Sequence, residues 1–406
     1  MPNVVFVAPF FREATLRFVE AAAALPGVRL GLVSQDPEER LPPGLRQRLA
    51  AHQRVSDGLD AQQIADATRV CAQRQGSVDR LIGMLEDLQV PLGEVRDALR
   101  LPGIGADAAR NFRDKARMKD VLSKHGLPCA KHRLAHTSEQ VLEFVREIGF
   151  PVVAKPPAGA GSRNTFRLDD HDQLTSYLRM HTPSAERPAM VEEFIVGQEH
   201  SFDSVCIDGR LIWYSINHYF PGPLEVVETP WIQWAVLLPR EVQTPEYSAI
   251  VQAARHALPV LGIGTNMSHM EWFRRSDGTV AISEVGARPP GAQFTTLISY
   301  AHDTDFYRAW SRLMIFDQFD PPERRYAAGA AYLRGQGHGR VKAVHGLEHA
   351  QKELGGLVVE AKLPHPGQAP GSGYEGEGYV IVRHPDTEVV SDALRRLITL
   401  IRVELG

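Results

Sequence analysis

Residues 268–284 read SHMEWFRRSDGTVAISE, two strand-like runs on either side of an Asp-Gly pair. Asp-Gly between such runs is the strongest short-range signal for a β-hairpin. If Asp277 and Gly278 form a two-residue loop, Glu271 and Glu284 become direct cross-strand partners, with Cβ atoms about 4.5–5.5 Å apart. Opposed carboxylates are unfavourable unless a cation lies between them, and hard oxygen ligands suit Mg²⁺ or Mn²⁺. The hairpin therefore predicts a metal site or, as the alternative, an exposed turn with two solvated glutamates.

The residues around the two carboxylates favour the enclosed metal site. Phe273 and Ile282 are expected on the same face as Glu271, where they would partly cover it. His269, two residues before Glu271, is expected to point into the same site. It would act there either as a catalytic group or as a structural hydrogen-bond partner.

A second segment combines a lysine with a glycine-rich loop. Val152–Lys155 is a strand-like apolar run that ends in lysine, and Gly159, Gly161 and Ser162 follow it. A fixed cation beside free backbone N–H groups can close on phosphate oxygens. The Gly-Lys-Ser of a Walker A loop is missing, and a plain turn is the alternative interpretation.

A third segment, residues 190–203, reads MVEEFIVGQEHSFD and places acidic residues at the end of an apolar run. Taken alone, it also fits a charged edge strand. Upstream, a helix is predicted from Asp107 to about His125, with Gly126 as its cap, and it carries Lys115. Together these segments form an ordered set of lysines, a loop and carboxylates.

The order and spacing of this set resemble the ATP-grasp superfamily, which includes D-alanine:D-alanine ligase, biotin carboxylase, enzymes of purine synthesis and L-amino acid ligases. The resemblance covers the whole chain. It implies a fold of mixed α/β and α+β class, with an N-terminal Rossmann-like domain in residues 1–110. An ATP-grasp domain would follow in residues 111–325, with a nucleotide-binding subdomain at about 111–200, and a β-rich C-terminal subdomain in 326–406.

The N-terminal hundred residues agree with that implication. Val4–Ala8 and Arg29–Val33 read as strands around a helix at Glu13–Leu25, the pattern of an open parallel sheet. No Gly-x-Gly-x-x-Gly follows the first strand, so a dinucleotide fingerprint is absent.

The resemblance also implies the cofactors, ATP and Mg²⁺ or Mn²⁺, and the residues that bind them. Glu271 and Glu284 match the metal ligands. The contacts implied for ATP are Lys115 and Lys155 on the phosphates, Gly159, Gly161 and Ser162 in a covering loop, Glu192 with the backbone of Phe194 and Ile195 on the adenine, and Glu199 on the ribose.

One departure concerns the last metal position. The family often has Glu-x-Asn-x-Arg there, whereas residues 284–288 read EVGAR. Gly286 supplies no oxygen, so water or substrate must complete the metal shell. Arg288 remains, and its guanidinium would suit a carboxylate, an acyl phosphate or an oxyanion, with a structural salt bridge as the alternative.

The substrate end is less clearly marked. Glu86, at the end of a predicted strand, lies where an open α/β sheet contacts its ligand. Residues 210–235 are predicted to form one long connection rich in aromatic side chains, which fits either a lid over a small substrate or ordinary packing. The expected substrate contacts are Glu86, Ser201, Trp234 and Arg288.

These residues fit phosphoryl transfer from ATP. The resemblance implies a ligase that phosphorylates a carboxylate and couples the acyl phosphate to an amine, with catalytic roles for Lys155, His269 and Arg288. The alternatives are a purine-type or biotin-type enzyme that transfers a formyl or carboxyl group, and a catalytically silent, ATP-binding regulatory protein. The resemblance implies small-molecule carboxylate and amine substrates and a homodimer.

Composition excludes several other classes. The 406 residues carry 45 Lys and Arg against 49 Asp and Glu, which leaves no basic coat for nucleic acid. Three distant cysteines, Cys71, Cys129 and Cys206, predict neither a disulfide framework nor a zinc site. No basic leader and no long apolar run are apparent, so we expect a cytoplasmic protein with no membrane partner.

Overall fold

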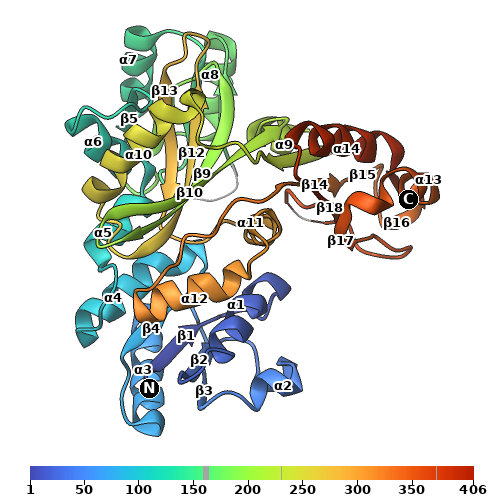
Figure 1. Cartoon of the computed structure of the whole chain (residues 1–406). Coiled ribbons are helices and arrows are strands. Elements are labelled where there is room, and N and C mark those ends of the chain that lie inside the picture. The colour runs from blue at the N-terminus through green and yellow to red at the C-terminus, as the bar shows by residue number, and fades with distance from the viewer. Residues whose placement is uncertain (159–163, 230, 372) are drawn as a thin grey trace.

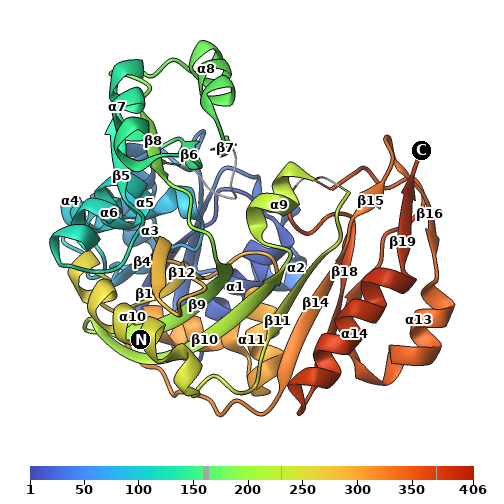
Figure 2. The same cartoon turned by 90° about the horizontal axis from the view of Figure 1, so that it is seen from above.

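The computed structural model describes residues 1–158, 164–229, 231–371 and 373–406, which form four sheets. In Figure 1 the N-terminal sheet lies at the bottom, and a small sheet with α7 (Ser138–Ile148) and α8 (His171–Met180) lies at the top. The C-terminal helices α13 (Leu347–Leu354) and α14 (Thr387–Leu400) lie to one side. Figure 2, seen from above, shows α7 and α8 well apart from α13 and α14. A large sheet connects these parts.

The N-terminal sheet is parallel, with the strand order β3-β2-β1-β4. Its strands alternate between two cores, because successive side chains point to opposite faces: Val4 joins one core and Val5 the other. The parallel pairing confirms the predicted strand–helix–strand unit. β3 reads Ala-His-Gln-Arg, which has too few apolar residues to be predicted as a strand. The elements are β1 (Asn3–Val7), α1 (Glu13–Ala23), β2 (Arg29–Ser34), α2 (Pro43–Arg46), β3 (Ala51–Arg54), α3 (Ala61–Gln75), β4 (Arg80–Ile82) and α4 (Gln89–Leu99).

Two short helices lead from this sheet to the small antiparallel sheet. The predicted continuous helix is divided into α5 (Ala106–Arg113) and α6 (Lys115–Lys124). The small sheet has the order β5-β8-β6-β7 and packs against α7 and α8 through one apolar cluster. Its strands are β5 (His132–Ala135), β6 (Val152–Lys155), β7 (Phe166–Leu168) and β8 (Ala189–Glu193).

The large sheet is antiparallel and has the order β13-β12-β9-β10-β11-β14-β18-β17. Beyond residue 325, the predicted domain boundary, β14 pairs with β11, so the sheet continues across that boundary. Its strands are β9 (Gln198–Ile207), β10 (Arg210–Phe220), β11 (Trp234–Leu238), β12 (Asn266–Arg274), β13 (Val280–Gly286), β14 (Ala327–Leu333), β17 (Val358–Lys362) and β18 (Gly378–His384).

Helices cover both faces of the large sheet. On one face, Phe202 and Met270 pack with residues of α6 and α10 (Ser248–Leu261). On the other, Trp234 and Tyr332 join a core that includes α11 (Phe294–His302), α12 (Phe306–Phe316) and the N-terminal sheet. Burial on both faces explains the continuous apolar runs of β11 and β14.

The C-terminal end adds a small sheet of order β15-β19-β16, with strands β15 (Gly335–Gln336), β16 (Val341–His345) and β19 (Arg402–Leu405). α14 packs on β14 and β18 through an apolar face that includes Val390, Leu394 and Leu397. Within the described ranges, no helix combines the length and the apolar character that crossing a membrane requires.

Candidate active site

The hairpin of β12 and β13 carries Glu271 and Glu284 as direct cross-strand partners, which confirms the predicted pairing. The predicted two-residue loop is wrong. Arg275 N donates to Thr279 O at 2.9 Å, so three residues form the turn between them. A turn of that length alone would move the two carboxylates out of register, and a second irregularity compensates for it.

That irregularity is a β-bulge at Ser283. Trp272 pairs with Ile282 and the next pair is Glu271 with Glu284, so Ser283 is the extra residue. Ser283 and Glu284 consequently both line a cavity, whereas Ile282 is fully buried in the core on the other face. The prediction that Ile282 shares a face with Glu271 is therefore wrong.

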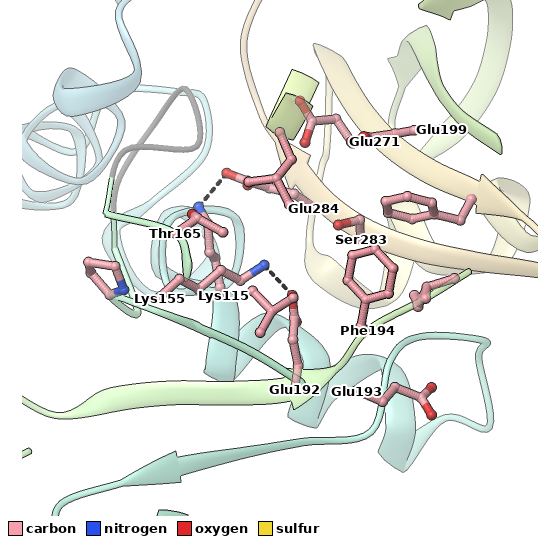
Figure 3. A pocket seen from close by; sticks show the side chains of 15 residues that line it. Lys115, Lys155, Thr165, Glu192, Glu193, Phe194, Glu199, Glu271, Ser283 and Glu284 are labelled. Carbon is pink, nitrogen blue, oxygen red and sulfur yellow. Dashed lines mark hydrogen bonds and ion pairs between the residues drawn. The ribbon is translucent and has the colours of Figure 1, made fainter. Parts of the chain in front are cut away.

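Lys115 approaches Glu284 from the first turn of α6. Asp114 breaks the predicted long helix because its side chain accepts hydrogen bonds from two backbone N–H groups of that turn, each at 3.0 Å. Lys115 Nζ lies 2.6 Å from Glu284 Oε1 (Figure 3). Burial raises the pKa of Glu284, but the cations around it, with Lys115 first and then Lys155 and Arg288, together outweigh burial and lower it. Glu284 is therefore held as a carboxylate.

A second buried carboxylate, Glu192, lies between two lysines. Lys155 Nζ, at the end of β6, is 2.5 Å from Glu192 Oε1 (Figure 3). Lys119 Nζ is 3.2 Å from Glu192 Oε2 and donates to Ser283 O at 2.9 Å. Burial raises the pKa of Glu192, but the two ammonium groups lower it to about 2. Lys119 thus connects this carboxylate to the bulge in β13.

We call the space between these groups cavity A. Figure 3 shows the lysines and the paired glutamates at one end of it, with Phe194 at the other and Glu193 directed away. Glu199 also lines it, and burial together with the charge of Glu271 raises the pKa of Glu199 well above its ordinary value. The cavity is lined by Lys115, Val153, Lys155, Pro156, Thr165, Glu192, Glu193, Phe194, Ile195, Glu199, Leu224, Glu271, Phe273, Ser283 and Glu284.

The predicted covering loop cannot be placed. Gly159, Gly161 and Ser162 lie outside the described residues. Lys155 and Pro156, which precede it, border cavity A.

A second space, cavity B, has a volume of about 220 Å³ and shares Glu271 and Glu284 with cavity A. Arg288 Nε lies 2.5 Å from Glu86 Oε2, so the predicted substrate contact Glu86 forms an ion pair with it. A Cβ added at Gly286 would lie only 3.1 Å from Glu86 Oε2, so the Glu86 carboxylate approaches closely where this chain lacks a side chain. The lining residues are Glu86, Tyr219, Pro223, Trp234, His269, Glu271, Glu284, Gly286, Arg288, Gly291, Ala292, Phe294 and Tyr374.

His269 enters cavity B with a fixed partner behind it. His269 Nδ1 is 2.6 Å from Asp203 Oδ1, and Asp203 is fully buried. Burial lowers the pKa of His269, but the carboxylates of Asp203 and Glu271 together outweigh burial and raise it to about 9. Asn217 donates to Asp203 and to Ser201 Oγ, the latter at 2.7 Å. Ser201 is thus fully buried behind the cavity rather than among its lining residues.

The aromatic residues predicted as a lid belong mostly to strands. Tyr214 and Tyr219 lie on β10, and Trp234 begins β11. Tyr214 stacks on Phe202 at 5.0 Å on one face of the sheet, whereas Tyr219 and Trp234 line cavity B on the other. The interpretation of residues 210–235 as one long connection is therefore wrong.

Glu271 and Glu284 are the candidate metal ligands at the junction of the cavities. In the part of the chain that the structure describes, no group of three or more His, Cys, Asp or Glu could hold a metal ion by itself. Mg²⁺ commonly uses one or two carboxylates together with substrate phosphates and water. The pair therefore fits a metal that binds with a phosphorylated ligand.

Comparison with known proteins agrees with this geometry. The ATP-grasp domain family model matches residues 120–303, which include Lys155, Glu192, Glu271 and Glu284. This part of the chain is an ATP-grasp domain. The match begins inside α6, so Lys115 lies just before it.

Relatives and solved structures show how far the likeness to other ATP-grasp proteins extends. The L-arginine-specific L-amino acid ligase of Bacillus subtilis is 22% identical over 59% of this chain and 59% of that protein. The chain spans about three fifths of the length of the first curated relatives it matches. An L-amino acid ligase from Bacillus licheniformis superposes with a TM-score of 0.78 and 19% identity, covering 100% of this chain and 99% of that one. N5-carboxyaminoimidazole ribonucleotide synthetase from Thermotoga maritima superposes with a TM-score of 0.72 and 20% identity, covering 100% of both chains.

Lys119, one residue before the matched segment, is a contact of the site that the sequence interpretation did not include. It follows Lys115 by four residues on α6, a spacing that puts both side chains on one helix face. That spacing is the signal that could have identified it.

We expect Lys119→Met to destabilise the fold by about 3–5 kcal/mol. The change leaves the buried Glu192 with one ammonium partner and removes the hydrogen bond from Lys119 to the Ser283 carbonyl. Urea unfolding followed by circular dichroism measures the change. Lys124→Met, at the exposed end of the same helix, is the matched control and should change stability by less than about 0.5 kcal/mol. Equal effects of the two variants would contradict the role of Lys119.

Two histidines on the neighbouring strands β9 and β10 make stability depend on pH. His200 and His218 form a ring contact at 4.6 Å, and burial lowers their pKa values to about 3 and about 4. In the unfolded chain both pKa values return to about 6.5. The unfolded state then binds more protons between about pH 4 and 6.5, so stability rises with pH in that window.

We expect His218→Gln to reduce the slope of unfolding free energy against pH, by up to about 1.4 kcal/mol per pH unit, because one titration is removed. Urea titrations at pH 4.5, 5.5 and 6.5 measure the slope. His349→Gln removes a well-exposed histidine and serves as the control. An unchanged slope in His218→Gln would contradict the assignment.

Proposed function

We propose that the protein is an ATP-dependent ligase that phosphorylates a carboxylate to an acyl phosphate and couples it to an amine, releasing ADP and phosphate. The observation that carries this proposal is that Glu271 and Glu284 line both cavities. Lys115 and Lys155 line cavity A beside these glutamates, and His269 and Arg288 line cavity B beside them. A phosphoryl donor and a carboxylate could therefore meet at the paired glutamates.

Cavity A has the groups that ATP needs. Lys115 and Lys155 would bind the phosphates, and Gly159, Gly161 and Ser162 would cover them. Glu192 Oε2 is buried, and the group that approaches it is Lys119 Nζ at 3.2 Å, which leaves a lone pair of this oxygen open. A buried carboxylate oxygen that can still accept a hydrogen bond fits the amino group of adenine. The backbone of Phe194 and Ile195 would complete the adenine contact, and Glu199 would accept from the ribose hydroxyls.

Glu271 and Glu284 would hold Mg²⁺ or Mn²⁺ together with phosphate oxygens, because carboxylate oxygens are the donors that these ions prefer. When bound, the ion neutralises charge on the phosphates. In the structure Lys115 forms an ion pair with Glu284. It would turn to the phosphates when ATP binds. Positioning and charge neutralisation are what phosphoryl transfer requires from a protein.

The chemistry then needs no protein nucleophile. A carboxylate oxygen attacks the γ-phosphorus and ADP leaves; the amine nitrogen attacks the carbonyl carbon, loses a proton, and phosphate leaves. Arg288 and the cationic His269 face the cavity where the carbonyl oxygen would become negative. The walls of cavity B would exclude water from the mixed anhydride.

A second candidate is a purine-type enzyme in which bicarbonate or formate replaces the organic carboxylate. Two observations favour it: the full-length similarity in fold to the carboxyaminoimidazole enzyme, and Gly286 at the last metal position. A biotin-type carboxylase and a silent, ATP-binding regulatory protein are weaker alternatives. The lysines, glutamates and arginine of the site argue against the silent form.

ADP release, measured against a panel of amino acids, hydroxy acids, bicarbonate and formate with several amines, tests the proposal. We expect release that depends on both a carboxylate and an amine, with an amide product of the expected mass. Release that depends on bicarbonate or formate would support the purine-type enzyme. ATP binding without stimulated release would support the regulatory protein. Sedimentation velocity would test the predicted homodimer.

A further inference from the structure

Cavity B ends in a wall of aromatic side chains that come from four separate elements. Tyr219 lies on β10, Trp234 on β11, Phe294 at the start of α11, and Tyr374 in the turn that precedes β18. The charged lining residues of the cavity are Glu86, His269, Glu271, Glu284 and Arg288. A ligand in this space would therefore meet both charged groups, with the Arg288 guanidinium among them, and apolar rings.

Tyr374 is the outermost ring of this wall. Its centroid lies 5.0 Å from that of Trp234, which stacks at 4.5 Å on Tyr332. Trp234 and Tyr332 are fully buried, whereas Tyr374 is partly exposed. The inner rings are therefore fixed by the core, and Tyr374 sets where the cavity stops.

Arg334 holds Tyr374 in this place. Arg334 Nη1 donates to Gly373 O at 2.9 Å and to Tyr374 O at 3.2 Å, and Nη2 donates to Val226 O at 3.1 Å. Val226 belongs to α9 (Pro223–Glu228), whose Pro223 also lines cavity B. One guanidinium therefore fixes two walls of the cavity through backbone carbonyls.

The turn has a second attachment, through Glu377. Its carboxylate accepts hydrogen bonds from Gly335 N at 2.5 Å and from Gly371 N at 3.0 Å. Gly376 has φ +59°, and a Cβ there would lie 2.8 Å from Leu333 O, so the turn requires glycine at that position. Several contacts thus place Tyr374 against β14 and β11.

The geometry points to Tyr374 as the residue that limits the size of the substrate, with Arg334 as its positioning residue. The substrate class is a carboxylate with a compact apolar side chain. A cavity of about 150 Å³ holds benzene, so the volume of about 220 Å³ has room for a carboxylate and one six-membered ring, and an indole would meet Tyr374. This inference rests on the proposed use of cavity B as the carboxylate site.

The test compares Tyr374→Ala with the unchanged protein. Calorimetry with Mg²⁺ and ADP present measures the affinities for alanine, leucine, phenylalanine and tryptophan, and ADP release with the same panel measures turnover. We expect Tyr374→Ala to raise the affinity for tryptophan relative to alanine at least tenfold, with the KM for ATP changed less than twofold. Tyr326→Ala, which removes a ring that packs under Arg383 at 4.5 Å and lines neither cavity, should keep the original order.

Arg334→Lys should shift the order in the same direction as Tyr374→Ala, since lysine cannot hold three carbonyls in the same planar geometry. Its melting temperature shows whether the fold remains. The inference would be overturned if Tyr374→Ala kept the original order of amino-acid affinities. It would also be overturned if the unchanged protein bound none of the four amino acids. A changed binding order without any turnover would support the inference and contradict the proposed ligase activity.

Discussion

Glu284→Gln is expected to lower kcat by at least about 10²–10³-fold while leaving the fold intact. The amide has nearly the same shape but no charge, so it loses the ion pair with Lys115 and one of the two carboxylates proposed for the metal. Removal of a single group that stabilises charge in a transition state has effects of this size. ADP release under saturating ATP measures the change.

The control for that variant lies on the same hairpin. Asp277→Asn alters a carboxylate in the turn, away from both cavities, and should leave turnover unchanged. Raising the Mg²⁺ concentration should partly restore activity in Glu284→Gln if the carboxylate binds the metal. Near-normal activity of Glu284→Gln without added metal would remove Glu284 from the site.

Lys155→Met should lower kcat/KM for ATP by about 10²–10³-fold, because it removes a buried cation from cavity A and leaves Glu192 with Lys119 alone. Lys155→Arg should not restore activity, since a guanidinium differs from an ammonium in size and geometry at a 2.5 Å contact. Calorimetric titration with ADP separates the loss of binding from the loss of chemistry.

Lys131→Met, at an exposed position beside β5, is the matched control for Lys155→Met and should bind ADP normally. A thermal melt of each variant shows whether lost binding reflects lost structure. Tight ADP binding by a well-folded Lys155→Met would contradict the phosphate role of Lys155.

The pairing of the two glutamates illustrates what could be predicted from the sequence. Asp-Gly between strand-like runs indicated a hairpin, and counting back from a two-residue loop put Glu271 opposite Glu284. The loop is longer than predicted, and the bulge at Ser283 offsets the difference. Bulges depend on tertiary contacts such as the bond from Lys119 to Ser283 O, so no local pattern could have indicated this one.

Other features depended on contacts between distant parts of the chain. Arg288 pairs with Glu86 across 202 positions in sequence, so neither residue alone indicates its partner. β10 is buried on much of both faces, which removes the alternation that would have marked it as a strand. Asp114 was an available signal, because a capping residue before Lys115 divides the predicted helix.

The continuity of the large sheet across residue 325 has a consequence for fragments of this protein. A fragment that stops at the end of the family match, at residue 303, would lack β14, and β11 would become an edge strand. β11 reads Trp-Ala-Val-Leu-Leu and is buried throughout, so its free backbone groups and apolar side chains would favour aggregation. The ATP-grasp segment therefore depends on residues 326–406 for solubility as well as for the wall of cavity B.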